Sequence, residues 1–220
     1  MTYESLSFDI DGTLWDSREL VAQGYNIQLR KEGLEHLCVD AQRLKSLFGQ
    51  VMTQIADQIF ESIPVPERYS LMDRCMNTEN QFLHDNPCRI GYPQVKETLA
   101  QLAQHHRLFI VSNSQCGYPE LCMEKLGLSP YISGHLCFGD TGTSKGQTIL
   151  TLMRQHHIEN CAYIGDTQGD YEATLEACVP FIWASYGFGT PAGYAAKIDS
   201  IAQLLDMDLD APAAHTPALR

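Results

Sequence analysis

Two aspartates, Asp9 and Asp11, stand two residues apart close to the N-terminus. The pattern over residues 3–8 predicts a short strand that ends directly before them. Side chains two residues apart in extended backbone point the same way, so both carboxylates can reach one small volume beyond the strand. Neighbouring carboxylates repel each other unless a cation binds there or one of them carries a proton. Because Mg²⁺ takes oxygen ligands and an aspartate can become an aspartyl-phosphate, the pair suits phosphoryl chemistry.

Gly12 follows this pair and lets the backbone turn sharply, which would bring N–H groups close to a bound ligand. The alternative interpretation is an ordinary Asp-Gly hairpin turn between two strands. The pattern over residues 17–31 is helical, however, and does not resemble a returning strand. The segment therefore indicates a strand, then a turn that carries two acids, then a helix.

Polar residues also follow two later apolar runs. Ser112-Asn113-Ser114 ends the run over residues 107–112, and its hydroxyl and turn amides could hold phosphate oxygens. Asp166 and Asp170 follow the run over residues 161–164. Taken singly, Ser112 also fits an ordinary turn and Asp170 an ordinary helix cap. Because ligands bind beyond the carboxyl ends of parallel strands, we expect these residues to lie beside the first pair of acids.

Lys145 stands at the start of another helical pattern. Its ammonium group could neutralise a phosphoryl group, whose charge is spread over its oxygens. Taken alone, Lys145 also fits a solvated residue at the beginning of a helix. The polar residues nevertheless appear in chain order, each at a strand end or in the loop beside it, and this favours one common site.

The order of helical and strand patterns predicts the fold class. Residues 17–86 look helical almost throughout, whereas strands and helices alternate after residue 94. This pattern predicts an α/β fold with a doubly wound parallel sheet, a Rossmann-like core, and an all-helical insertion after the first strand. We place the core at 1–15 and 90–220 and the insertion at 16–89. Later strands are expected at 107–112, 136–138, 161–164 and 181–184, and a loosely held tail at 208–220.

The composition is that of a globular protein, and we expect it to work in the cytoplasm. The 220 residues can bury a sizeable core. The formal net charge of −12 argues against nucleic acid as a partner. We see no leader at the N-terminus and no apolar run near the ~18 residues that a membrane span needs. The eight cysteines are scattered without C-x-x-C pairs, so we expect reduced thiols.

These segments together resemble the motifs of the haloacid dehalogenase superfamily, and in particular its phosphoglycolate phosphatase-like branch. The first motif runs from Phe8 to Ser17, the second ends in Ser112, the third is Lys145, and the fourth runs from Gly165 to Asp170. The resemblance covers residues 4–206 and implies that the helical insertion is a small cap domain. One departure is that a glycine follows Lys145 where many relatives carry proline.

The resemblance implies Mg²⁺ as the cofactor and a role for each acid. Asp9 would attack the phosphorus, become the phosphoenzyme and bind the metal. Asp11 would protonate the leaving oxygen and then activate water, while its backbone carbonyl binds the metal. Asp166 would complete the protein ligands, and Asp170 would support the metal site directly or through water.

The resemblance also implies a set of substrate-binding residues. Ser112 and Lys145 would hold the phosphoryl oxygens, and Lys145 would also position Asp9. The cap would choose the substrate through the segment 47–52. This segment carries no obvious carboxylate-binding arginine, although Arg43 lies one helical turn away. The expected substrate-binding residues are Gly12, Thr13, Phe48, Gln50, Ser112, Asn113 and Lys145.

The leading functional hypothesis is a Mg²⁺-dependent phosphatase of small phosphorylated metabolites. The resemblance suggests phosphoglycolate, and nucleotide and sugar phosphates are alternatives. A phosphosugar mutase would share the motifs and the cap, whereas a dehalogenase would lack the acid found here at Asp11. A catalytically idle binding module is disfavoured because every catalytic acid is retained. The expected partner is therefore a small phosphorylated metabolite, with no nucleic acid, no membrane and no oligomeric state assigned.

Overall fold

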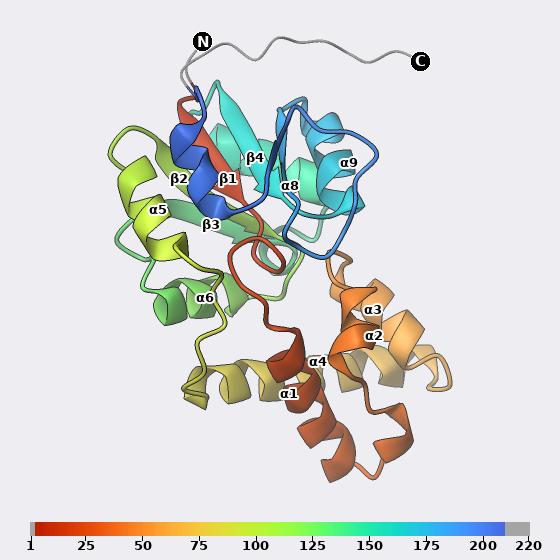
Figure 1. The fold of residues 1–220 in the computed structure, drawn as a ribbon. Helices are drawn as coiled ribbons and strands as arrows, with labels where there is room; N and C mark the ends of the chain where they lie inside the picture. Colours follow the sequence, from red (N-terminus) through yellow and green to blue (C-terminus); the bar gives the residue numbers. More distant parts are fainter. Residues whose placement is uncertain (1–2, 210–220) are drawn as a thin grey trace.

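The structure is a computed structural model that describes residues 3–209, and these contain one sheet of six parallel strands. The strand order β3-β2-β1-β4-β5-β6 places β1 between β2 and β4 (Figure 1). Strands and helices alternate along the chain after the helical insertion, which confirms the predicted α/β, Rossmann-like fold class. The strands are β1 (Ser5–Phe8), β2 (Arg107–Ser112), β3 (Ile132–Cys137), β4 (Cys161–Gly165), β5 (Phe181–Ala184) and β6 (Ala196–Ile198).

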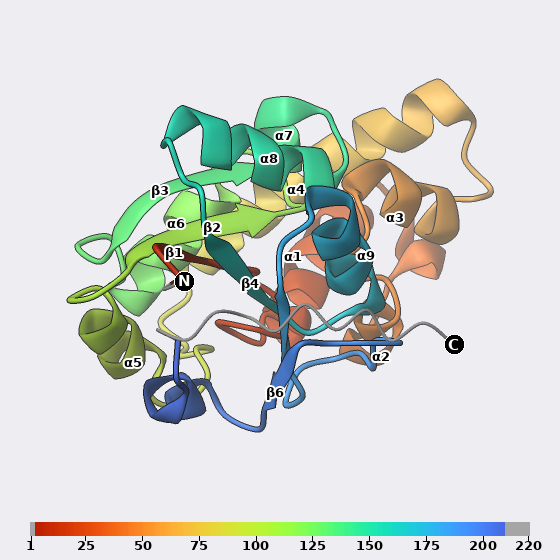
Figure 2. The same ribbon diagram turned by 90° about the horizontal axis from the view of Figure 1, so that it is seen from above.

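Both faces of the sheet are covered, so its central strands β1, β2 and β4 are buried on both sides. In β2, Leu108 and Ile110 pack into one apolar cluster, whereas Phe109 and Val111 pack into a second cluster. This alternation follows from the two-residue period of a strand. Figure 2 shows α8 and α5 on opposite sides of the sheet. The first cluster includes residues of α5 (Val95–Leu102), α6 (Tyr118–Leu126) and the 3₁₀ helix η2 (Ile201–Asp206), and the second includes residues of α8 (Lys145–Gln155) and α9 (Gln168–Ala177).

The part of the chain between β1 and α5 is helical and lies below the sheet in Figure 1. Its two longest helices pack against each other, and Gly24 lies at their contact. A Cβ atom at Gly24 would lie 2.7 Å from the Cα of Glu79, so glycine allows the backbones to come this close. The segment contains α1 (Arg18–Lys31), the 3₁₀ helix η1 (Glu35–Leu37), α2 (Ala41–Lys45), α3 (Met52–Ile59) and α4 (Val65–Asp85). The division into a core and a cap at residues 16–89 stays a prediction.

Two strands differ from their predicted extents because their sequences hide the strand pattern. β3 begins at Ile132, four residues before the predicted start at 136, because Ser133, Gly134 and His135 interrupt the apolar run. β6 was not predicted, since it has only three residues and the lysine in its middle is exposed. The short helix α7 (Phe138–Thr141) follows β3 directly. The expectation of a loose tail over 208–220 falls almost entirely outside the described residues.

Two expectations about side chains and hydropathy can be compared directly with the structure. All eight cysteines are unpaired, as expected for reduced thiols. Within residues 3–209, every helix is too short or too polar to cross a membrane.

We predict that Leu152→Ala lowers the free energy of unfolding by about 2–5 kcal/mol, because Leu152 is fully buried between α8 and the sheet. The matched control is Leu175→Ala, which removes the same atoms from a side chain that is 59% exposed. We expect the control to change stability by no more than roughly 0.5 kcal/mol. Urea denaturation of both variants measures the difference, and equal losses would contradict this account of the core.

Candidate active site

The carboxyl ends of the central strands bring the predicted polar residues together. Phe8 pairs with Ile110 of β2 and with Ile164 of β4, so the three strands end at one level. The backbone N–H of Asp9 donates a hydrogen bond to the carbonyl of Ile164 at 2.9 Å. Asp9 thus leaves β1 beside β4, and its carboxylate enters the volume beyond the sheet.

Lys145 joins two of the predicted acids inside this volume. Its Nζ donates hydrogen bonds to Asp9 Oδ1 at 2.7 Å and to Asp170 Oδ1 at 2.6 Å, and all three side chains are buried. Burial opposes the charge on Lys145, but Asp170 and Asp9 outweigh it and raise the pKa of the amine well above its usual value. Lys145 is therefore a charged, structurally fixed residue and not a solvated helix start.

Asp170 is both a helix-capping residue and a member of the site. Its Oδ2 accepts hydrogen bonds from the N–H and the hydroxyl of Thr167, at 2.9 and 2.7 Å, in a capping box at the start of α9. Its Oδ1 faces Lys145 instead. Burial alone would raise the pKa of Asp170, but Lys145 and Thr167 hold it below the usual value. Asp170 is thus the helix cap that one interpretation of the sequence expected, and it also contacts the lysine that binds Asp9.

Asp9 and Asp11 occupy different environments, although they are two residues apart. Burial raises the pKa of Asp9 to about 7 against the opposing effect of Lys145. Asp11 has no lysine partner, and its Oδ1 accepts hydrogen bonds from Trp15 at 2.8 Å, from Tyr118 at 2.9 Å and from Ser17. Burial raises its pKa to about 6 despite these donors. The two acids thus differ in their partners, since Asp9 contacts a charged lysine and Asp11 accepts hydrogen bonds from three neutral donors.

Asp166 lies where two backbone turns approach it closely. Gly12 has a φ of +85°, and a side chain there would overlap the carboxylate of Asp166. A side chain at Gly187 would overlap the same carboxylate. The N–H of Phe188 donates a hydrogen bond to Asp166 Oδ2 at 2.6 Å. The loop after β5 is therefore part of the site, which the sequence analysis missed; two glycines flanking Phe188 were the available signal.

The predicted contribution of Gly12 and Thr13 is different in the structure. Their N–H groups donate hydrogen bonds within the turn, to the carbonyls of Trp15 and Ile10. Their backbone donors are thus already used in holding the turn together. The structure instead shows Gly12 making room for Asp166, as described above.

The buried acids fit a magnesium ion. Carboxylate oxygens of Asp9, Asp166 and Asp170 lie within 4.8 Å of one another. Oδ1 of Asp166 is enclosed and has no hydrogen-bond partner among the described residues. An all-oxygen donor set is the kind that Mg²⁺ prefers, and the unpartnered oxygen is where an ion would compensate the buried charge. The side chain of Asp11 is not in this group.

A cavity opens in front of Asp9 and Asp11 and is lined from two sides. Its volume is about 420 Å³, including the part open to solvent. Of the residues expected to bind substrate, Phe48 and Gln50 line it, whereas Gly12 and Thr13 do not, and their role in binding stays a prediction. The core contributes Asp9, Asp11, Ser112, Asn113, Ser114, Gln115, Tyr118 and Lys145, and the helical segment contributes Val21, Tyr25, Phe48, Gly49, Gln50, Met52, Ile55 and Glu79.

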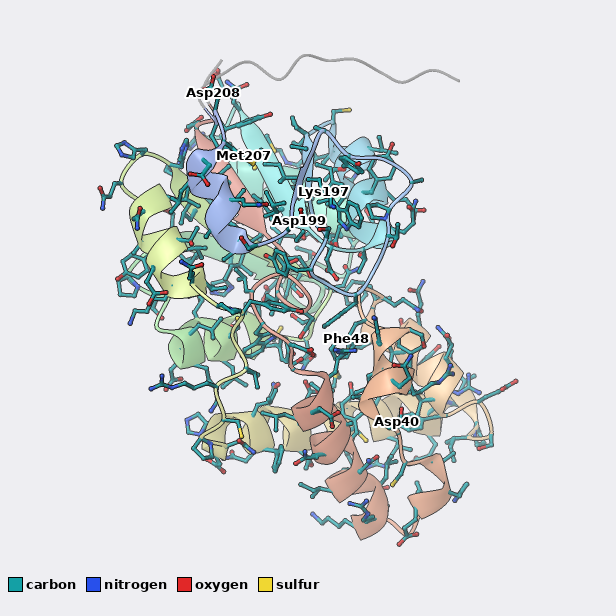
Figure 3. The ribbon with its side chains drawn as sticks, in the orientation of Figure 1. Asp40, Phe48, Lys197, Asp199, Met207 and Asp208 are labelled. Atoms are coloured by element: carbon teal, nitrogen blue, oxygen red, sulfur yellow. The ribbon has the colours of Figure 1, made fainter. Side chains whose placement is uncertain are left out.

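The loop between α2 and α3 connects the helical segment to the core. The Asn113 side chain donates a hydrogen bond to the carbonyl of Gly49 at 2.7 Å. The Phe48 ring packs against Phe188, with centroids 5.8 Å apart, at the junction visible in Figure 3. Gln50 accepts a hydrogen bond from Gln58 within the helical segment. The loop between α2 and α3 thus contacts both the turn after β2 and the loop after β5, whose Phe188 binds Asp166.

The departure from the family pattern at Gly146 has a local cause. The carboxylate of Glu176 lies where a side chain at Gly146 would be. Glu176 accepts hydrogen bonds there from Ser144 and Gln147 in the first turn of α8. Glu176 thus fixes the start of α8, and Lys145 keeps its place between the acids.

The comparisons with known proteins agree with this geometry. The family model for haloacid dehalogenase-like hydrolases matches residues 6–184. The chain therefore belongs to the haloacid dehalogenase-like hydrolase family, as its motifs predicted. Among its relatives it resembles the phosphoglycolate phosphatases.

The relatives are distant in sequence but similar over most of their length. A phosphoglycolate phosphatase from Aquifex aeolicus is 27% identical, over 82% of this chain and 84% of the relative. A 5'-nucleotidase from Pseudomonas aeruginosa is 23% identical, over 94% of this chain and 97% of the relative. The crystal structure of a predicted phosphatase from Clostridium acetobutylicum has a TM-score of 0.79 at 20% identity, covering 94% of this chain and 98% of that one, and shows the shared fold.

We predict that Mg²⁺ stabilises the folded protein and that Asp166→Asn removes most of this effect. A ligand present at 100 times its dissociation constant adds about 2.7 kcal/mol, which is on the order of 5–10 °C in melting temperature for a chain of this size. Thermal unfolding with and without MgCl₂, at constant ionic strength, measures the shift.

The control for this measurement is Asp199→Asn, which changes a carboxylate paired with Lys197 on the surface (Figure 3). We expect it to keep the full Mg²⁺ shift. A wild-type protein whose melting temperature ignores Mg²⁺, or an Asp166→Asn variant that keeps the full shift, would show that the ion does not bind here.

Proposed function

We propose that the chain is a Mg²⁺-dependent phosphatase that hydrolyses small phosphorylated metabolites through an aspartyl-phosphate on Asp9. The observation that best supports this proposal is the buried carboxylate of Asp9, which contacts Lys145 and lines a cavity together with Asp11. A nucleophile, a fixed cation and a separate carboxyl group of raised pKa therefore meet at one place. This is the set that phosphoryl transfer to a carboxylate requires.

Each residue of the site has a separate role in the proposed reaction. Asp9 attacks the phosphorus, and Lys145 holds phosphoryl oxygens and keeps Asp9 in place. Asp11, oriented by Trp15 and Tyr118, gives its proton to the leaving oxygen and then takes one from the water that hydrolyses the intermediate. The hydroxyls of Ser112 and its neighbours hold the remaining phosphoryl oxygens.

Asp9, Asp166 and Asp170 would hold the magnesium ion, with the backbone carbonyl of Asp11, and the ion would neutralise phosphoryl charge. Asp170 would act partly through Lys145, which it contacts directly. The helical segment 16–89 would act as a cap. Its residues form one wall of the cavity, which supports a role in selecting the alcohol part of the substrate.

The first test is release of inorganic phosphate from a panel of phosphomonoesters, with Mg²⁺ and after exhaustive chelation. We expect hydrolysis only with the metal. Isomerisation of a sugar phosphate without phosphate release would favour a mutase and overturn the proposal. Full activity after chelation would overturn the metal assignment.

Asp9→Asn and Asp11→Asn should fail in different ways with p-nitrophenyl phosphate. Asp9→Asn removes the nucleophile, so no phosphoenzyme should form. Asp11→Asn keeps the nucleophile but removes the proton donor and base. General acid–base catalysis typically contributes ~10² to 10⁴-fold to the rate. Because nitrophenolate scarcely needs protonation, Asp11→Asn should give a burst of nitrophenol followed by a slow phase. Stopped-flow absorbance and intact-mass measurement record the burst and the bound phosphoryl group.

Asp199→Asn serves again as the control and should turn over like the wild type. The assignment of roles is wrong if Asp9→Asn accumulates a phosphoryl group while Asp11→Asn does not. It is also wrong if both variants lose the burst equally, since the two carboxyl groups would then act as one unit.

A further inference from the structure

Glu79 is a buried acid for which the proposed chemistry has no role. It lies in α4, is 3% exposed and lines the cavity in front of Asp9. Its Oε2 is enclosed and has no hydrogen-bond partner among the described residues. A buried carboxyl oxygen without a partner is costly for the folded state, and a ligand in the adjoining cavity would supply that partner.

The packing around Glu79 fixes its position in the cavity wall. Gly24 of α1 lies against the backbone of Glu79 and leaves no room for a side chain of its own. The side chains of Tyr25 and Gln115 lie beside the carboxyl group, one from the helical segment and one from the core. Glu79 is therefore held from both sides in the wall of the cavity that it lines.

The lining of the cavity is poor in positive charge. Lys145 is the one basic residue among the lining residues, and Asp9 and Asp170 already share its ammonium group. Arg43, the nearest arginine in the sequence to the cap loop, donates a hydrogen bond to the carbonyl of Gln58 instead. A substrate carboxylate would thus meet the acids of the cavity without a cation of its own.

A hydroxyl group, by contrast, would match what Glu79 offers. Burial, and then the charge of Asp11, raise the pKa of Glu79 well above its usual value, which favours the protonated form. A protonated carboxyl group donates one hydrogen bond and accepts others, and a hydroxyl group does the same. Val21, Met52 and Ile55 line the rest of this wall and suit the carbon skeleton of a small alcohol.

We infer that Glu79 hydrogen-bonds a hydroxyl group of the substrate's alcohol part, and that the chain acts on phosphate monoesters of small neutral polyols or sugars in preference to phosphoglycolate. The inference rests on the proposed phosphatase function and names its substrate class. Glu79 is in this view a specificity-determining residue that takes no part in the bond changes at phosphorus.

The test uses phosphates that differ in one group. 2-Hydroxyethyl phosphate is compared with ethyl phosphate, 2-aminoethyl phosphate and phosphoglycolate, and glycerol 3-phosphate is compared with 3-phosphoglycerate. We expect kcat/KM of the wild type to be at least about tenfold higher for the hydroxyl compound of each set, the size of one good neutral hydrogen bond. p-Nitrophenyl phosphate is assayed beside them as a general phosphatase substrate.

Glu79→Leu should abolish the preference for the hydroxyl compounds, whereas Glu79→Gln, whose amide donates and accepts, should keep most of it. Glu79→Leu should also raise the melting temperature, because it removes a buried carboxyl group whose Oε2 has no partner among the described residues. The matched control is Thr78→Val on the same helix, whose hydroxyl contacts Gln28 and not the cavity. The control should keep the wild-type order of substrates.

Several results would overturn the inference. If the wild type prefers phosphoglycolate or 3-phosphoglycerate to the hydroxyl compounds, the inference is wrong, and this result does not depend on whether any Glu79 variant folds. Preference for 2-aminoethyl phosphate would mean that Glu79 binds a cation as a carboxylate. An equal loss on every substrate in Glu79→Leu, with a lower melting temperature, would make Glu79 a structural residue. If no ester is hydrolysed, p-nitrophenyl phosphate included, the proposed function itself is wrong and the inference falls with it.

Discussion

The ammonium group of Lys145 between Asp9 and Asp170 is the interaction on which the site depends. Asp9, Asp166 and Asp170 are confined to one buried volume, and such charges are tolerated only when paired or compensated. Lys145 compensates two of them with hydrogen bonds of 2.7 and 2.6 Å. The geometry of α8 follows from this need, because its first turn must keep the amine in place. The third acid, Asp166, is left with an unpartnered oxygen, whose charge either a proton or a second cation would compensate.

Each acid is also held by a backbone element that the fold supplies. Asp9 is fixed by its N–H bond to β4, Asp170 by the capping box of α9, and Asp166 by the N–H of Phe188. Parallel strands that end at one level make this possible, because several loops then meet over one edge of the sheet. Gly12 and Gly187 leave the space that the Asp166 carboxylate occupies. The residues that do chemistry are thus positioned by rigid elements, and only the cavity wall from the helical segment is independent of the sheet.

The fold class and the acids were predictable because both depend on local signals. Apolar runs bounded by polar turns identify the central strands, and strand ends of a parallel sheet must meet, so Asp9, Asp166 and Lys145 could be expected together. β6 and the start of β3 were not predictable, since short or polar strands are stabilised by their neighbours and carry no pattern of their own. Tyr118 was missed for another reason: it contacts Asp11 across 107 residues of sequence, and nothing local marks a partner chosen by packing.

The contrast between local motifs and contacts chosen by packing also explains why family membership leaves the substrate undetermined. The four motifs lie at the sheet edge, where charge balance allows few alternatives, whereas the family match over residues 6–184 extends through the helical segment without naming a substrate. The opposite wall of the cavity is built from α1, α3 and α4 and the loop before α3, where most lining residues are apolar and can be exchanged without disturbing the acids. Relatives named for phosphoglycolate and for nucleotides can therefore share one chemistry. Under the inference above, one buried acid in that wall, Glu79, would change which alcohol can be accepted. Selectivity would then be set by the polarity of the wall, while reactivity would be set by the charges at the sheet.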